Sequence, residues 1–173
     1  DDYERWLVPP SKYYMSYGAT DILGDNRPLR NWKGTHYEGG VRVPALAYRP
    51  GTLKPLKTAE PVYVCDILPT LAAFADAEVM PDMHVEGIDI GDVLTGGTTG
   101  VERIFYWKTG RQYALRSGDW KLIHRGASLD EGIDELYNVT DDPNEEHDVA
   151  HGNPDIVLAL RKELARQAEM DVD

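Results

Sequence analysis

The sequence predicts an α/β protein whose C-terminal part is of the α+β class, with a small antiparallel sheet and a C-terminal helix. Residues 43–48 form a continuous apolar run, which is typical of a strand covered on both faces of an α/β sheet. Aromatic and β-branched segments separated by turn residues follow between residues 104 and 138 and predict antiparallel strands. An apolar stripe at helical spacing comes last and predicts the helix.

The first elements are a loop, a strand and a helix. Prolines and glycines interrupt residues 1–31, so we expect a loop that lies on a larger body. The strand at 43–48 ends before Pro50, and Pro44 fits its beginning or a sheet edge. Residues 65–75 predict a core-facing amphipathic helix with Asp66 as its N-cap and Pro69 in its first turn. Its apolar residues recur at helical spacing: Ile67, Leu68, Leu71 and Phe74.

The C-terminal elements follow a connection at residues 87–100 that is rich in Gly, Asp and Thr. We expect strands at 104–107, 113–116, 120–124 and 135–138, and a hairpin turn at 117–119. The final helix has Asn153 as its N-cap candidate and Pro154 at its first position. Its apolar stripe contains Val157, Leu160, Leu164 and Ala168.

Composition excludes several classes of function. The formal net charge of −12 argues against a nucleic-acid partner, because phosphate binding requires clustered Lys and Arg. Any anion site must therefore use local cations. No apolar run approaches the roughly 20 residues of a membrane span, so we expect no membrane partner. Cys65 is the only cysteine, which excludes an internal disulfide.

Residues 28–44 crowd glycines and ionisable groups ahead of the predicted strand. Gly34, Gly39 and Gly40 allow positive φ or close backbone approach, and Lys33 beside them can present its ammonium group to an anion. The segment is not a P-loop, because Gly34 follows Lys33 and the glycine spacing differs. From the pattern alone, a tight turn with solvated charges is the simpler interpretation.

Ordered blocks of the sequence resemble the sulfatase family, of the arylsulfatase type within the alkaline phosphatase superfamily. The first block, 26–30 with 33–44, is similar to the second sulfatase signature region. Similarity continues at 66–71, 115–123, 135–138 and 142–145. The blocks cover most of residues 26–150, and they correspond to the C-terminal portion of the family.

The resemblance implies a chemistry that this chain carries only in part. Sulfatases use a formylglycine nucleophile and a divalent cation, usually calcium. The lysine that matches Lys33 contacts the sulfate and offsets charge on the leaving oxygen, so Lys33 is the candidate catalytic and substrate-binding residue. His36 and His84 are weaker substrate-binding candidates; a turn-stabilising role for His36 and a surface position for His84 are the alternatives.

Other residues of the matched blocks are interpreted as structural. We expect Glu38 and Arg42 to fix the loop through an ion pair or backbone hydrogen bonds. Tyr37 and Trp32 either wall a pocket or pack in the core, and Lys121 belongs to a sheet motif of the family.

The chain also departs from the family pattern. Formylglycine requires a Cys/Ser-x-Pro-x-Arg motif, with proline two positions after the cysteine. The first proline after Cys65 is Pro69, so Cys65 does not match this motif. No paired Asp cluster of the N-terminal metal motif occurs, and residues 25–27 are a poor match to its Asp-Asn-Gly element. We therefore expect no metal ligands within this chain and no sulfatase activity from the chain alone.

The resemblance also implies partners and domains. Residues 1–100 would end the large mixed sheet of the sulfatase α/β domain, and residues 101–173 would form the antiparallel subdomain. Expected partners are a sulfated small molecule or glycan, the missing N-terminal domain, and other copies in an oligomer, since a truncated sheet exposes apolar surface. The family acts in lysosomes, the periplasm or outside the cell. A non-catalytic binding or assembly module and a phosphodiester or phosphonate hydrolase are the alternative functions.

Overall fold

The computed structural model describes residues 25–80 and 82–171, so the loop predicted for residues 1–24 lies outside the described residues. Contacts divide the described chain into two compact units. Residues 25–43 and 104–171 form the sheet unit, and residues 44–103 form the second unit. The domain boundary expected at residues 100 and 101 concerns the intact protein and stays a prediction.

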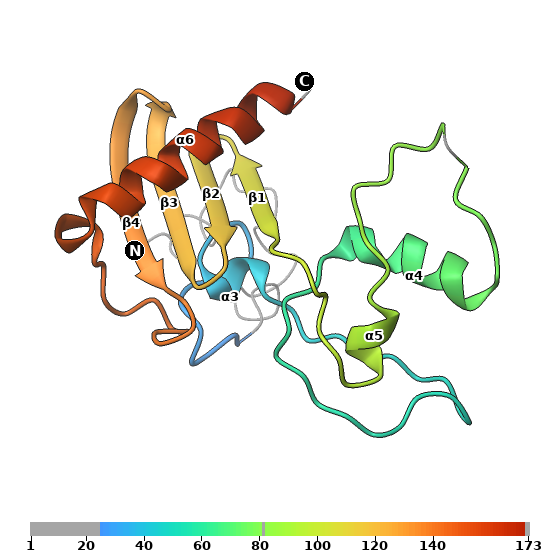
Figure 1. Ribbon diagram of the computed structural model, residues 1–173. Helices are drawn as coiled ribbons and strands as arrows, with labels where there is room; N and C mark the ends of the chain where they lie inside the picture. Colours follow the sequence, from blue (N-terminus) through green and yellow to red (C-terminus); the bar gives the residue numbers. More distant parts are fainter. Residues whose placement is uncertain (1–24, 81, 172–173) are drawn as a thin grey trace, which may run out of the picture. The chain divides into compact units, whose positions relative to one another are not determined.

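The sheet unit contains a four-stranded antiparallel meander (Figure 1). Its strands are β1 (Ile104–Thr109), β2 (Gln112–Ser117), β3 (Trp120–Ser128) and β4 (Glu131–Asn138), paired in chain order. Gly118 adopts a φ of 55° in the two-residue turn between β2 and β3, a conformation that glycine tolerates well. The predicted meander and hairpin are therefore confirmed.

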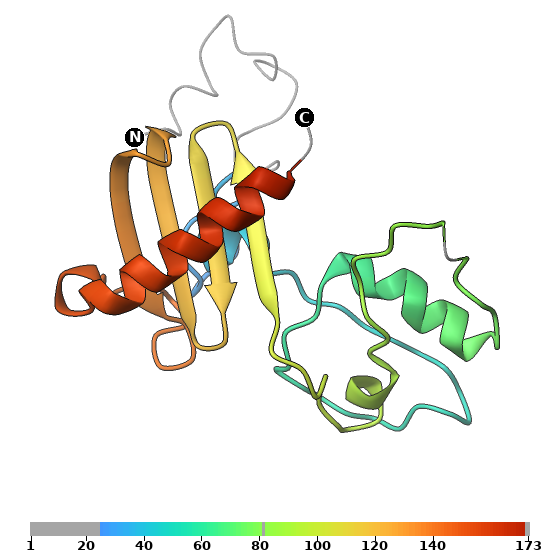
Figure 2. The same ribbon diagram turned by 45° about the horizontal axis from the view of Figure 1, so that its top comes forward.

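Helix α6 (Pro154–Met170) crosses one face of this sheet (Figures 1 and 2). Its Leu160 and Leu164 pack against one residue from each of β2, β3 and β4: Leu115, Leu122 and Leu136. The predicted apolar stripe is thus confirmed. Asn153 precedes the helix as predicted, but its side chain does not cap it. Instead Asn153 Nδ2 donates a hydrogen bond to the Val149 carbonyl oxygen at 2.9 Å.

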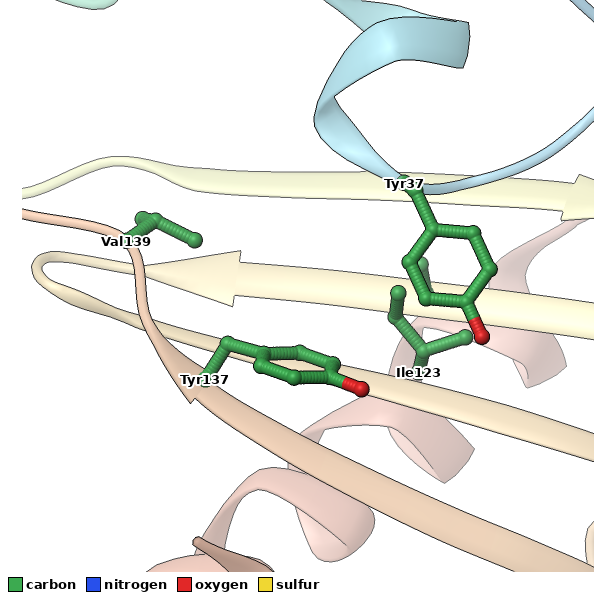
Figure 3. Close-up of a cluster of buried hydrophobic side chains, with 5 residues drawn as sticks. Tyr37, Ile123, Tyr137 and Val139 are labelled. Atoms are coloured by element: carbon green, nitrogen blue, oxygen red, sulfur yellow. The ribbon is translucent and has the colours of Figure 1, made fainter. Parts of the chain in front are cut away.

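The opposite face of the sheet is covered by the segment that leads into helix α3 (Glu38–Val41). Figure 3 shows Tyr37 extending from the start of α3 toward the sheet. It packs in a cluster with Ala114, Ile123, Tyr137 and Val139. Because side chains alternate along a strand, β3 presents Leu122 to α6 and Ile123 to Tyr37. The sheet is therefore the middle of three layers.

The second unit has very little apolar core of its own. It contains η1 (Val64–Asp66), α4 (Ile67–Phe74) and α5 (Gly91–Leu94). Among its described residues, Ile90 and Val93 are the buried hydrophobic side chains. A buried carboxylate contributes instead, because Asp66 pairs with Arg103 at 2.6 Å and accepts hydrogen bonds from the Tyr63 and Ile88 backbone N–H groups.

Two expectations for this part of the chain are wrong. Residues 43–48 form no strand, and Val43, Leu46 and Tyr48 are 77%, 92% and 81% exposed. The reason is that the sheet of the described residues consists of the strands β1, β2, β3 and β4, and it offers this run no partner strand. The predicted helix is present as α4, but Ile67 and Leu71 on its apolar stripe are exposed rather than buried.

Asp66 also acts differently from the predicted N-cap. Its carboxylate makes no capping bond to α4 and accepts instead from residues outside the helix. None of the helices in the described part of the chain combines the length and apolar character that a membrane crossing requires.

Candidate functional site

Lys33 lies on an exposed turn of the sheet unit. Lys33 and Gly34 form the turn, with Gly34 at a φ of 94°. The turn is closed by Thr35, whose backbone N–H and hydroxyl both donate to the Trp32 carbonyl oxygen, at 3.2 and 2.9 Å. Lys33 forms no ion pair with any residue that the structure describes. Its ammonium group is thus free to meet an anion from solvent.

The glycines beside this turn permit close packing of backbone on backbone. Gly39 N–H donates to the Arg30 carbonyl oxygen at 2.9 Å. A Cβ at Gly39 would lie 2.3 Å from the Asn31 carbonyl oxygen, and one at Gly40 would lie 2.1 Å from the Thr35 carbonyl oxygen. Neither position has room for a side chain, so the loop requires glycine at both.

The C-terminal side of the turn is anchored by a buried charge cluster. Lys121 on β3 places its Nζ 2.8 Å from Glu38 Oε1 and 2.9 Å from Glu145 Oε1. The Glu145 carboxylate also accepts the Glu38 backbone N–H at 2.6 Å. Arg42 is a weaker partner of Glu38, at 3.9 Å. Glu38 therefore fixes the loop as expected, chiefly through Lys121 and Glu145.

The N-terminal side of the turn is anchored through Arg30. Its Nη1 donates to the Tyr137 hydroxyl at 2.7 Å and to the Glu145 carbonyl oxygen at 2.8 Å. The guanidinium group also lies 4.2 Å from the centroid of the Tyr37 ring. Of the two roles considered for Tyr37, core packing is the one observed.

A buried carboxylate joins the two tyrosines. Glu135 on β4 accepts hydrogen bonds from the Tyr37 and Tyr137 hydroxyls, both at 2.7 Å, and pairs with Arg125. Burial, followed by the hydrogen bond to Glu135, raises the pKa of Tyr37 to about 12. Burial alone would raise the pKa of Glu135, but the tyrosine hydroxyls and nearby arginines hold it below its ordinary value. Both tyrosines thus remain neutral donors to an ionised carboxylate.

His36 points into the sheet unit rather than toward solvent. It is 3% exposed, and its Nε2 lies 3.1 Å from Thr109 Oγ1. Burial, with a smaller contribution from Lys121, lowers the pKa of His36 to about 4. A neutral, buried imidazole favours the turn-stabilising role over direct contact with a sulfate. The substrate-binding role of His36 stays a prediction.

We expect His36 to make the sheet unit sensitive to acid. Its pKa is about 4 in the folded chain and about 6.5 when unfolded, so the unfolded chain binds more protons between these values. Its contribution to stability is present above about pH 6.5 and is lost as the pH falls through about 4, in total about 3 kcal/mol. Urea unfolding at pH 7 and pH 4 should show this loss in the native chain and a smaller one in His36→Gln. The exposed His151→Gln serves as control, and equal pH dependence in all three proteins would contradict the prediction.

His84 is exposed in an irregular part of the second unit and has no hydrogen bond or ion pair with a described residue. Its proposed contact with substrate stays a prediction. Lys121 and Glu145 were not singled out as site residues from the sequence. The available signal was a lysine inside an apolar strand, on the same face as Ile123.

The described residues do not fit the metal or the nucleophile that the resemblance implies. Residues 25–80 and 82–171 contain no group of three or more His, Cys, Asp or Glu side chains arranged to hold a metal ion. Cys65 is half-buried in η1, and the next residue, Asp66, is committed to Arg103. No catalytic step through calcium or formylglycine is therefore assigned to these residues.

Comparison with known proteins gives consistent relatives. Human arylsulfatase A is 32% identical over 190 residues, covering 94% of this chain and 36% of the relative. Among solved structures, Ps i-CgsB superposes with a TM-score of 0.66 at 27% identity, covering 85% of this chain and 32% of that chain. BT33336S-sulf, from a study of glycosaminoglycan metabolism by Bacteroides thetaiotaomicron, superposes with a TM-score of 0.67 at 23% identity, covering 82% and 31%. No profile of a known protein family matches the chain. The chain spans about a third of the length of these relatives.

Proposed function

Because this chain belongs to the sulfatase family and corresponds to its C-terminal portion, we propose that it completes an enzyme that hydrolyses sulfate esters. The observation that carries the proposal is the exposed Lys33 ammonium on a turn anchored at both sides to a packed sheet. A cation presented from an anchored turn is suited to stabilise charge that develops in a transition state. The proposed substrate is a sulfated small molecule or glycan. We also propose that the enzyme is exported from the cytoplasm.

Lys33 is the residue of this chain to which we assign a catalytic role. Its ammonium group would contact the sulfate and offset negative charge on the leaving oxygen. The protein's net charge of −12 repels anions at long range, so such a local cation is needed. The nucleophile and the ligands of a divalent cation are proposed to come from the N-terminal portion of the family, because the described residues supply neither.

The second unit is proposed to contact that N-terminal portion. Most of the exposed large apolar side chains of the described chain belong to it, and its buried apolar residues are Ile90 and Val93. A unit with so small a core gains stability by covering its apolar surface. Its most exposed large residues are Leu46, Tyr48, Val64 and Met80. Association between copies of the chain is the competing way to cover the same surface.

The proposal is tested by measuring hydrolysis of p-nitrophenyl sulfate by the chain alone and by the chain joined to its N-terminal portion. We expect no turnover from the chain alone and metal-dependent turnover from the completed protein. Lys33→Ala should lower kcat of the completed protein by about 100- to 1000-fold, whereas the exposed Lys162→Ala should leave it unchanged. Sedimentation measures the molecular mass of the chain before and after addition of the N-terminal portion. It therefore distinguishes association between copies of the chain from association with the N-terminal portion.

Three results would count against the proposal. Turnover by the chain alone would show that it carries its own nucleophile. Faster hydrolysis of p-nitrophenyl phosphonates than of the sulfate would favour the phosphonate alternative. Absence of turnover from the completed protein would favour a binding module.

A further inference from the structure

One residue of the sheet unit fastens both sides of the Lys33 turn. On the N-terminal side, Arg30 Nη1 donates to the Glu145 backbone carbonyl oxygen at 2.8 Å. On the C-terminal side, the Glu38 backbone N–H donates to the Glu145 carboxylate at 2.6 Å. Glu145 lies 115 residues from Arg30 and 107 from Glu38 along the chain. Glu145 therefore bridges the two sides of the turn, in addition to the direct hydrogen bond from the Gly39 N–H to the Arg30 carbonyl oxygen.

Glu145 is itself held in place by the sheet unit. Its side chain is completely buried, and its Oε1 lies 2.9 Å from Lys121 Nζ on β3. Its backbone N–H donates to the Asp142 carbonyl oxygen at 3.1 Å, and its φ of 56° turns the chain at this point. Because β3 pairs with strands on both sides, Lys121 offers a fixed support.

Burial of the Glu145 carboxylate costs free energy, because its charged form loses hydration. Desolvation raises the pKa of its carboxyl group, although Lys121 and the Glu38 backbone N–H act in the opposite direction. One ammonium group, on Lys121, also faces two carboxylates, those of Glu38 and Glu145. Well-packed apolar residues commonly replace buried ion pairs without loss of stability, so stability alone is a poor explanation for this carboxylate.

We propose that Glu145 is a positioning residue that holds both sides of the Lys33 turn and thereby directs the Lys33 ammonium group at the sulfate. The inference rests on the proposed function, because it requires Lys33 to act on the substrate. A carboxylate can accept hydrogen bonds at both oxygens, whereas an amide accepts at only one. Glu145→Gln keeps the size of the side chain, but it removes the negative charge that pairs with Lys121 and turns an NH2 group toward either Lys121 or the Glu38 N–H.

The kinetic test uses the protein completed by its N-terminal portion, with p-nitrophenyl sulfate at pH 7. We expect Glu145→Gln to lower kcat by about 10- to 100-fold with a much smaller change in KM, because displacement of a catalytic group by about 1 Å has effects of this size. The matched control is Glu146→Gln, an adjacent exposed carboxylate, and it should behave like the native protein. The double variant Lys33→Ala with Glu145→Gln should be no slower than Lys33→Ala alone, since a positioning residue acts only through the group that it positions.

Amide hydrogen exchange of this chain provides a readout that is independent of activity. Glu145→Gln should speed exchange in residues 30–41 and leave α6 protected, which separates a loosened turn from unfolding. An unchanged kcat, a double variant whose losses multiply, or unchanged exchange in residues 30–41 would each overturn the inference. If Lys33→Ala alone leaves kcat unchanged, the proposed role of Lys33 fails and the role of Glu145 falls with it. That case is recognised from the single Lys33 variant, before Glu145 is tested.

Discussion

Replacement of Lys121 by methionine is expected to lower the free energy of unfolding of the sheet unit by about 3–5 kcal/mol. The Lys121 side chain is completely buried and lies between Glu38 and Glu145, which are also buried. Methionine fills similar space but leaves two carboxylates without their cation. Removal of one partner from a buried ion pair is strongly destabilising for this reason. Urea or thermal unfolding followed by circular dichroism measures the effect.

Two further variants separate loss of charge pairing from loss of packing. Lys162→Met removes an exposed lysine of α6 and should change stability by less than about 0.5 kcal/mol. The triple variant Lys121→Met, Glu38→Gln and Glu145→Gln removes the three buried charges of the cluster and should recover most of the lost stability. A triple variant as unstable as Lys121→Met would show that the lysine contributes by packing instead.

Asp66→Asn is expected to destabilise the second unit by about 3–5 kcal/mol. The completely buried carboxylate of Asp66 receives two hydrogen bonds from Arg103, at 2.6 and 2.8 Å. It also receives the backbone N–H groups of Tyr63 and Ile88, at 2.7 and 3.0 Å. An amide of the same shape loses the charge and points its NH2 group at some of these donors. The unit has little apolar core to compensate for this loss.

Hydrogen exchange measured separately for residues 44–103 and for the strands detects this change in the unit concerned. Asp76→Asn is the matched control, because Asp76 is exposed and its φ of 51° is tolerated by asparagine. Protection of residues 44–103 that is equal in Asp66→Asn and in the control would contradict the expected role of Asp66.

The elements that could be predicted from the sequence are those defined by nearby residues. The four strands, the turn at Gly118 and the helix that begins at Pro154 each follow from a local pattern of apolar and turn residues. The strand predicted at 43–48 depended on a sheet that the described residues do not provide. An apolar run indicates that a segment requires cover, but it does not show that the same chain supplies it.

The candidate site was predictable to a similar extent. The Lys33 turn and its glycines could be recognised because they are contiguous. The supporting residues could not be found in this way, since Lys121 is 83 positions from Glu38, and pairing at that separation is set by the tertiary fold. The burial of His36 was equally hidden, because its partner Thr109 is 73 positions away.

The long separation between Arg30 and Glu145 has a consequence for biosynthesis. The strands pair with their immediate chain neighbours and can assemble as they leave the ribosome. The segment around Lys33 is translated earlier and cannot pack before its partners in the sheet unit are made. Glu145, which supports this segment, is added only after translation has passed β4. A nascent chain halted before that point has its sheet and the contact of Arg30 with Tyr137, but it lacks the residue that joins both sides of the Lys33 turn.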